Sequence, residues 1–173
     1  MFMRIDGRNN NDLRKTTIET NTMQFCDGSA VISTGYTKVL CTASIETRVP
    51  PFLIGQNKGW ITAEYSMLPG STTPRSSRGN QKKGRSQEIQ RLIGRSLRGI
   101  VDMNLLGERT IILDCDVLQA DGGTRCAAIT GAYIALYQAV EGLVLNKVIN
   151  RIPLISAVAA VSVGFVNQTA ILD

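Results

Sequence analysis

Histidine is absent from the 173-residue chain, and its absence excludes several classes of catalytic site at once. Without an imidazole the chain cannot build a Ser-His-Asp triad, a Cys-His dyad, a His-ligated zinc site or an imidazole proton shuttle from its own residues. Aromatic residues are also scarce, at 5% of the chain, so a sheet that recognises RNA by stacking bases is not expected.

The four cysteines contain no C-x-x-C pair, so the sequence indicates neither a zinc knuckle nor a redox dithiol. They are Cys26, Cys41, Cys115 and Cys126. We expect four small, buried or half-buried thiols in a reducing cytoplasm.

Long hydrophobic runs are lacking as well. The longest, residues 154–166, has 13 residues interrupted by serine and glycine, so it is too short for a membrane span and predicts a buried strand. The N-terminus has no apolar segment of the secretory type. With 43% hydrophobic and 19% charged residues, the chain is predicted to form one soluble, cytoplasmic domain over residues 1–173.

The positive charge of the chain is concentrated in one segment. Residues 75–98 contain eight basic residues and one acid, Glu88, a net of +7, whereas the whole chain has a net of +5. Such a run is often an ordinary solvated surface, but it also suits a polyanionic partner. Residues 69–84 are almost free of apolar side chains and predict a long, mobile, basic loop.

A helix is predicted over about 85–101, because its apolar residues recur on one side. Arg91, Arg95 and Arg98 fall together on the opposite side. An arginine stripe that faces away from a core is typical of a phosphate-tracking surface or of a subunit interface, and the sequence does not choose between them.

The remaining pattern predicts an α+β fold, a mixed sheet with helices on one face. Residues 29–45 indicate a hairpin with a Thr-Gly turn, and further strands are expected at 59–67, 109–118, 155–166 and from 169 onward. A second helix is predicted over about 124–141. Trp60 and Tyr65 are interpreted as core or interface aromatics.

The sharpest local signal is the turn at residues 119–125, between a strand and the second helix. Gly122 and Gly123 allow a tight turn and close approach of a ligand, and the helix N-terminus that follows is a natural anion site. Thr124 adds a hydroxyl and Arg125 a guanidinium. An ordinary capped turn has the same appearance, but an arginine at this end of a helix dipole is unfavourable unless an anion compensates it.

Two further groups are candidates for a site. Arg85 is predicted to lie near the apolar side of the first helix, where it needs a partner and could clamp an anion together with Arg125. Asp114 and Asp116, with Asp121 nearby, suggest a metal site or, as the preferred interpretation, acids that pair with the arginines of the first helix.

Several motifs, in order along the chain, make it resemble the ribonuclease PH family of phosphorolytic 3′→5′ exoribonucleases. They are RIDGR at 4–8, RVPPF at 48–52, KGWITAEYSMLP at 58–69, EIQRLIGR at 88–95, DCDV at 114–117 and QADGGTR at 119–125. The resemblance implies a fold like domain 2 of ribosomal protein S5 and a hexameric ring built as a trimer of dimers. It also implies tRNA precursors as substrates, with other structured RNA 3′ ends, and neither DNA nor a membrane as partner.

The resemblance also assigns residues. It implies that inorganic phosphate, the co-substrate, is held by Arg85, Gly123, Thr124 and Arg125, and that it attacks the 3′-terminal linkage to release a nucleoside diphosphate without a histidine base. The candidates for RNA contact are Arg75, Arg78, Lys82, Lys83, Arg91, Arg95 and Arg98.

In the family an acidic segment beyond the position of Asp173 supplies the carboxylates for Mg²⁺ and for the general acid. We therefore expect a C-terminally truncated member whose residues 1–173 contain no metal ligand and no assigned catalytic acid. The alternative is a catalytically silent module that binds RNA or completes a ring, and a weaker one is an anion-binding protein that never meets RNA.

Overall fold

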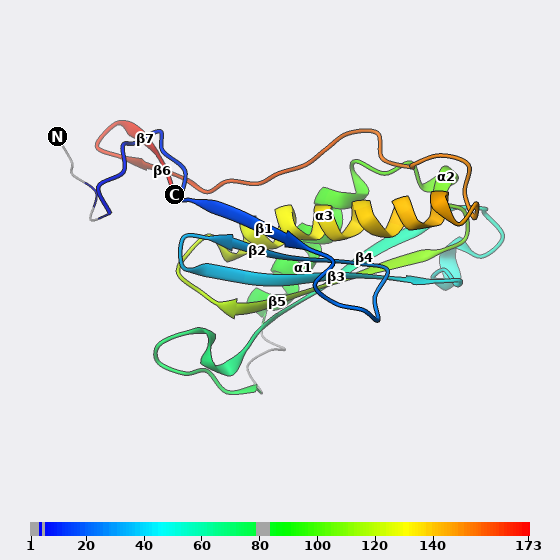
Figure 1. Ribbon diagram of the computed structural model, residues 1–173, viewed down its shortest axis with the longest axis horizontal. Helices are drawn as coiled ribbons and strands as arrows, with labels where there is room; N and C mark the ends of the chain where they lie inside the picture. The colour runs from blue at the N-terminus through cyan, green and yellow to red at the C-terminus, as the bar shows by residue number, and fades with distance from the viewer. Residues whose placement is uncertain (1–3, 5, 79–83) are drawn as a thin grey trace.

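The computed structural model describes residue 4, residues 6–78 and residues 84–173, which form a five-stranded mixed sheet with helices on one face (Figure 1). The strand order is β1-β2-β3-β5-β4. The strands are β1 (Thr16–Thr20), β2 (Gly28–Thr34), β3 (Thr37–Glu46), β4 (Trp60–Met67) and β5 (Thr110–Gln119). Neighbouring strands are antiparallel, except that β4 runs parallel to β5 at the edge.

Buried and more exposed residues alternate along β3 and β5, and the buried ones form one face of the sheet. Every second residue of β5 from Ile111 to Val117 is buried, and these side chains lie beside the buried positions of β3. The hairpin between β2 and β3 turns at Gly35, which has a φ of 57° that glycine adopts without strain. The predicted hairpin with a Thr-Gly turn is therefore confirmed.

The two long helices cover this buried face. α1 (Gly84–Arg98) packs on β4, and α3 (Thr124–Leu145) packs on β2, β3 and β5. A shorter helix, α2 (Met103–Leu106), begins at Asp102, whose carboxylate accepts from two backbone amides of the first turn. Both long helices were predicted, and α3 runs four residues beyond its predicted end at 141.

α3 approaches the sheet very closely because small residues lie at the contact. A Cβ added to Gly131 would lie 2.8 Å from the Sγ of Cys41. By length and hydropathy alone α3 is also long and apolar enough to span a membrane, but half of the window concerned is buried inside the protein. The pattern therefore suits a core helix, which is apolar around most of its circumference when it is covered on several sides.

The C-terminal segment differs from the prediction. Residues 155–162 run back over α3 without joining a strand ladder, and β6 (Val163–Val166) pairs with β7 (Thr169–Leu172) in a separate exposed hairpin (Figure 1). The predicted buried strand over 155–166 is wrong for most of its length. Apolar composition alone does not make a strand, because its backbone also needs a neighbouring strand to receive its hydrogen bonds.

The cysteines behave as predicted. Cys41 and Cys115 are buried partners on β3 and β5, Cys26 and Cys126 are half-buried, and all four are free thiols.

Candidate anion-binding site

The turn between β5 and α3 has the geometry that its sequence predicts. Gly122 and Gly123 adopt φ values of 81° and 60°, in the left-handed region that glycine tolerates best. Gly123 is the N-cap of α3 and makes no side-chain cap, and the first turn of the helix contains no acidic residue. The first turn of α3 therefore supplies no negative side chain to the positive end of its own dipole, which favours a bound anion. The carboxylate of Asp173 does approach this end, 3.0 Å from where a Cβ on Gly123 would lie, but it is paired with Arg14.

A cavity of about 290 Å³ opens in front of this turn, and Arg85 lines it from α1. All four predicted phosphate ligands share this cavity: Arg85, Gly123, Thr124 and Arg125. Arg85 is exposed at the cavity, whereas the helical pattern had placed it toward the packed side. The fold thus joins two candidate groups that lie almost 40 residues apart in the sequence.

Arg125 reaches from the cavity to α1. Its Nη1 lies 3.2 Å from Oε1 of Glu88, and both side chains are about half exposed. Glu88 is the one acid within the basic segment 75–98. An ion pair of this exposure contributes little stability and leaves the guanidinium able to exchange partners with an incoming anion.

Two side chains outside the turn hold its backbone in place. The hydroxyl of Thr37, at the start of β3, accepts from the Asp121 amide at 2.9 Å and donates to the Gly122 carbonyl at 2.5 Å. Arg14 donates to the Asp121 carbonyl and, at 2.5 Å, to a carboxylate oxygen of Asp173. Neither Thr37 nor Arg14 was singled out from the sequence.

A third side chain reaches the turn from β4. The hydroxyl of Tyr65 lies 2.9 Å from Oγ1 of Thr124, and the Tyr65 side chain is buried. Burial raises the pKa of the phenol, against the opposing effects of its bond to Thr124 and of the charges on Arg85 and Arg125. The sequence predicted a core or interface aromatic. The ring lies in the core, and the pattern gave no sign of the contact made by the hydroxyl.

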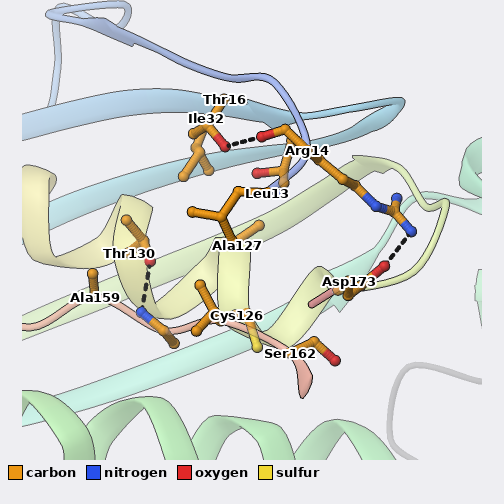
Figure 2. A pocket seen from close by; sticks show the side chains of 14 residues that line it. Leu13, Arg14, Thr16, Ile32, Cys126, Ala127, Thr130, Ala159, Ser162 and Asp173 are labelled. Atoms are coloured by element: carbon orange, nitrogen blue, oxygen red, sulfur yellow. Dashed lines mark hydrogen bonds and ion pairs between the residues drawn. The ribbon is translucent and has the colours of Figure 1, made fainter. Parts of the chain in front are cut away.

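A second cavity, of about 230 Å³, lies behind the same turn (Figure 2). Figure 2 shows it between Ile32 of the sheet, the first turns of α3 around Cys126 and Thr130, and the segment at 159–162. The Arg14–Asp173 ion pair lies at one end. Arg14 therefore links the turn to the C-terminal segment.

Comparison with known proteins decides the family. Residues 12–140 match the family model described as "3′ exoribonuclease family, domain 1". The chain belongs to this ribonuclease PH family. It is 56% identical over 175 residues to a ribonuclease PH from Moorella thermoacetica, an alignment that covers 99% of this chain and 70% of the relative. The relationship assigns the chain to the phosphorolytic 3′→5′ exoribonucleases, a class of nucleotidyltransferase.

Solved structures of more distant proteins share the fold. Rrp46 of rice (Oryza sativa) superposes with a TM-score of 0.79 and 23% identity, covering 98% of this chain and 72% of that one. The Archaeoglobus fulgidus exosome with RNA bound at its active site gives a TM-score of 0.82 and 23% identity, with coverages of 98% and 70%. The expected fold, like domain 2 of ribosomal protein S5, is confirmed.

The candidate RNA-contacting residues of this ribonuclease PH family member fall into four groups. Arg75 and Arg78 are exposed on the loop that follows β4. Arg91 and Arg95 are exposed on α1 and line an open hollow of about 360 Å³ with Glu88. Lys82 and Lys83 lie outside the described residues.

Arg98 does not share the exposed face of Arg91 and Arg95. Its Nη1 donates to the Ile61 carbonyl at 2.8 Å, and its guanidinium lies over the Trp60 ring, 4.6 Å from the centroid. Burial, followed by the charge of Arg95, lowers the pKa of Arg98. The predicted stripe of three arginines is therefore wrong at this position, because the last turn of α1 lies against the edge strand and the long side chain folds onto it.

The acids of β5 face away from both helices. Asp114 and Asp116 lie on the open face of the sheet, where Glu64 is the register partner of Asp114. Burial raises the pKa of both aspartates, and neighbouring acids raise that of Asp114 further. The prediction that they pair with arginines of the first helix is wrong, because alternation along β5 points them to the opposite side of the sheet.

The described residues do not fit a divalent cation. Within residue 4, 6–78 and 84–173, no group of three or more Asp, Glu or Cys side chains is arranged to hold a metal. Asp121, within the turn at residues 119–125, and Asp173, beside it, are both already paired with Arg14. A site for Mg²⁺ needs several free oxygen ligands, so these residues do not form one.

Proposed function

We propose that this chain binds inorganic phosphate in the cavity between α1 and the β5–α3 turn and directs it at the 3′-terminal linkage of an RNA. One observation carries the proposal: Arg85, from α1, lines the same cavity as Gly123, Thr124 and Arg125. Two guanidinium groups, a hydroxyl and the uncapped N-terminus of α3 make this cavity suited to a small, doubly charged anion.

The reaction follows from this arrangement. An oxygen of the bound phosphate forms a bond to the phosphorus of the terminal linkage, and the bond from that phosphorus to the preceding 3′-oxygen breaks. The products are a nucleoside diphosphate and an RNA that is one residue shorter, whose 3′-oxygen takes up a proton. Phosphate is already an anionic nucleophile at neutral pH, so a chain without histidine can act by positioning and charge neutralisation.

We further propose tRNA precursors and other structured RNA 3′ ends as substrates. The exposed arginines Arg75, Arg78, Arg91 and Arg95 support this, because an arginine surface next to the phosphate cavity suits an RNA backbone that enters the site. A hexameric ring and a cytoplasmic location belong to the same proposal. Four free thiols suit a reducing compartment.

No step is assigned to Mg²⁺, because the described residues do not form a site for it. A divalent ion in the reaction would require ligands in addition to these residues. No residue is assigned as the proton donor to the leaving 3′-oxygen.

The test is a phosphorolysis assay on an RNA with a short single-stranded 3′ tail, with Mg²⁺ present and inorganic phosphate either added or omitted. We expect release of nucleoside diphosphates that depends on phosphate and is lost in Arg125→Gln. Arg151→Gln, an exposed arginine away from the cavity, is the matched control and should behave as the wild type.

Nucleotide release without phosphate would contradict the proposal. RNA binding without any release would favour the alternative of a catalytically silent RNA-binding module, which the comparisons do not favour.

A further inference from the structure

Tyr65 combines a core position with a contact to the anion site. It lies on the helix-covered face of β4, in register with Cys115 of β5, and its side chain is 2% exposed. Its hydroxyl lies 2.9 Å from Oγ1 of Thr124, the first residue of α3. A phenylalanine would fill the same core volume, so packing alone does not account for the hydroxyl.

The direction of this hydrogen bond follows from burial. Both hydroxyls can donate and accept. Among the described residues, Thr124 is the side chain to which the Tyr65 hydroxyl is bonded. If Thr124 were the donor, the phenolic hydrogen would be left unpaired in the core, which is costly. Tyr65 is therefore the donor and Thr124 the acceptor.

This direction leaves the hydrogen of the Thr124 hydroxyl free to point elsewhere. Thr124 lines the cavity that Arg85 and Arg125 also line. An anion bound there offers oxygen acceptors to that hydrogen, and a bond to a charged acceptor is stronger than one between neutral groups.

Tyr65 is protonated at neutral pH. Burial is the largest influence on the phenol, and it raises the pKa of Tyr65 even though Arg85 and Arg125 act in the opposite direction. The group therefore remains a donor at neutral pH.

We propose that Tyr65 is a positioning residue for phosphate: its phenol donates to Thr124 Oγ1 and so turns the Thr124 hydroxyl hydrogen toward the anion between Arg85 and Arg125. This inference rests on the proposed function of the cavity. Tyr65 does not touch phosphate itself. It acts by setting the orientation of the Thr124 hydroxyl. The two hydroxyls then work as a unit, and removal of either removes the same contribution to phosphate binding.

The experiment compares four variants of the full chain: Tyr65→Phe, Thr124→Val, the double variant and Thr124→Ser. Calorimetric titration with inorganic phosphate gives Kd, and phosphorolysis at saturating RNA gives kcat and the KM for phosphate. Tyr137→Phe is the matched control, because this tyrosine is on α3, partly exposed and not among the residues that line the anion cavity.

We expect Tyr65→Phe to weaken phosphate binding about three- to tenfold, the size of one hydrogen bond between neutral groups. Thr124→Val should weaken it at least as much, and the double variant should match Thr124→Val alone. Thr124→Ser, which restores the hydroxyl, should recover most of the phosphate affinity that Thr124→Val loses. RNA affinity should be unchanged in all of them.

Three outcomes would overturn the inference. A Tyr65→Phe variant that binds phosphate as tightly as the wild type would do so, and so would fully additive losses in the double variant. Thr124→Val with wild-type phosphate affinity would overturn it even if Tyr65→Phe failed to fold. A wild-type chain that does not bind phosphate at all would instead overturn the proposed function, and this inference with it.

Discussion

The hydroxyl of Thr37 lies 2.5 Å from the carbonyl oxygen of Gly122, the first glycine of the anion turn. Thr37 begins β3 and is 1% exposed, and the same hydroxyl also accepts from the amide of Asp121. A buried side chain of the sheet therefore makes two hydrogen bonds to the backbone of the turn. The turn keeps its left-handed conformation in part because β3 holds it there.

Replacing Thr37 by valine tests this support. Valine keeps the shape but removes the hydroxyl, so the Asp121 amide loses a buried acceptor and the Gly122 carbonyl a donor. We expect Thr37→Val to lower the free energy of unfolding by about 1–3 kcal/mol and to raise the KM for phosphate. Urea denaturation and phosphate titration measure the two effects. Thr37→Ser, which keeps the hydroxyl and loses the methyl group, is the control. A loss in Thr37→Ser with none in Thr37→Val would show that the methyl group, not the hydroxyl, matters.

In the proposed function, Glu88 competes with bound phosphate for Arg125. Its carboxylate lies 3.2 Å from the guanidinium at a half-exposed position. Glu88→Gln removes a negative charge beside the anion cavity at little cost in stability, so we expect the Kd for phosphate to fall about two- to fivefold. Calorimetric titration measures it. Glu19→Gln, on exposed β1, removes the same charge elsewhere and should leave the Kd unchanged. A weaker affinity in Glu88→Gln would mean that Glu88 instead orients Arg125 for the anion.

Truncation of two arginines of α1 should have different effects, one on stability and the other on RNA binding. Arg98 stacks on Trp60 and donates to the Ile61 carbonyl, so Arg98→Ala should cost about 1–3 kcal/mol of stability. Arg91 is exposed, so Arg91→Ala should leave stability unchanged, weaken RNA binding and reduce the slope of log affinity against log salt by about 1. Thermal unfolding and filter binding over a salt series separate the two. The same response from both variants would contradict the assignment.

Asp114, on the open face of the sheet, should make the stability of the protein depend on pH. Burial and neighbouring acids raise the pKa of Asp114 in the folded protein. The folded state therefore holds this proton more tightly than the unfolded chain does, so the ionised carboxylate opposes folding at neutral pH. We expect Asp114→Asn to stabilise the protein at pH 7 by less than about 1 kcal/mol, because the group is partly solvated.

This gain should shrink as the pH falls through the raised pKa, where the wild-type carboxyl becomes neutral by itself. Urea denaturation at a series of pH values measures it. Asp12→Asn, at an exposed carboxylate of the N-terminal loop, is the comparison. A gain that is constant at all pH values would mean that charge is not its cause.

Local pattern was sufficient for much of the fold. The hairpin of β2 and β3, the strands β4 and β5, and both long helices follow from alternation, helical periodicity and glycine turns within single segments. The sequence also indicated the anion turn, because two glycines before a helix that begins with Thr124 and Arg125 favour a bound anion whatever surrounds them. Motifs distributed along the chain were enough to suggest the family.

Other features depended on elements that are distant in the sequence. Arg85 joins the turn only because α1 and α3 lie side by side on one face of the sheet, and Thr37 and Tyr65 reach it from two different strands. Arg98 folds onto β4 instead of facing solvent, and residues 155–162 form no strand because no neighbouring strand meets them. Local preferences along the chain are enough to predict which segments form helices, strands and an anion turn. Which side chains meet at that turn depends on how the elements pack, because a hydrogen bond or an ion pair requires distances of a few ångströms between residues far apart in the sequence.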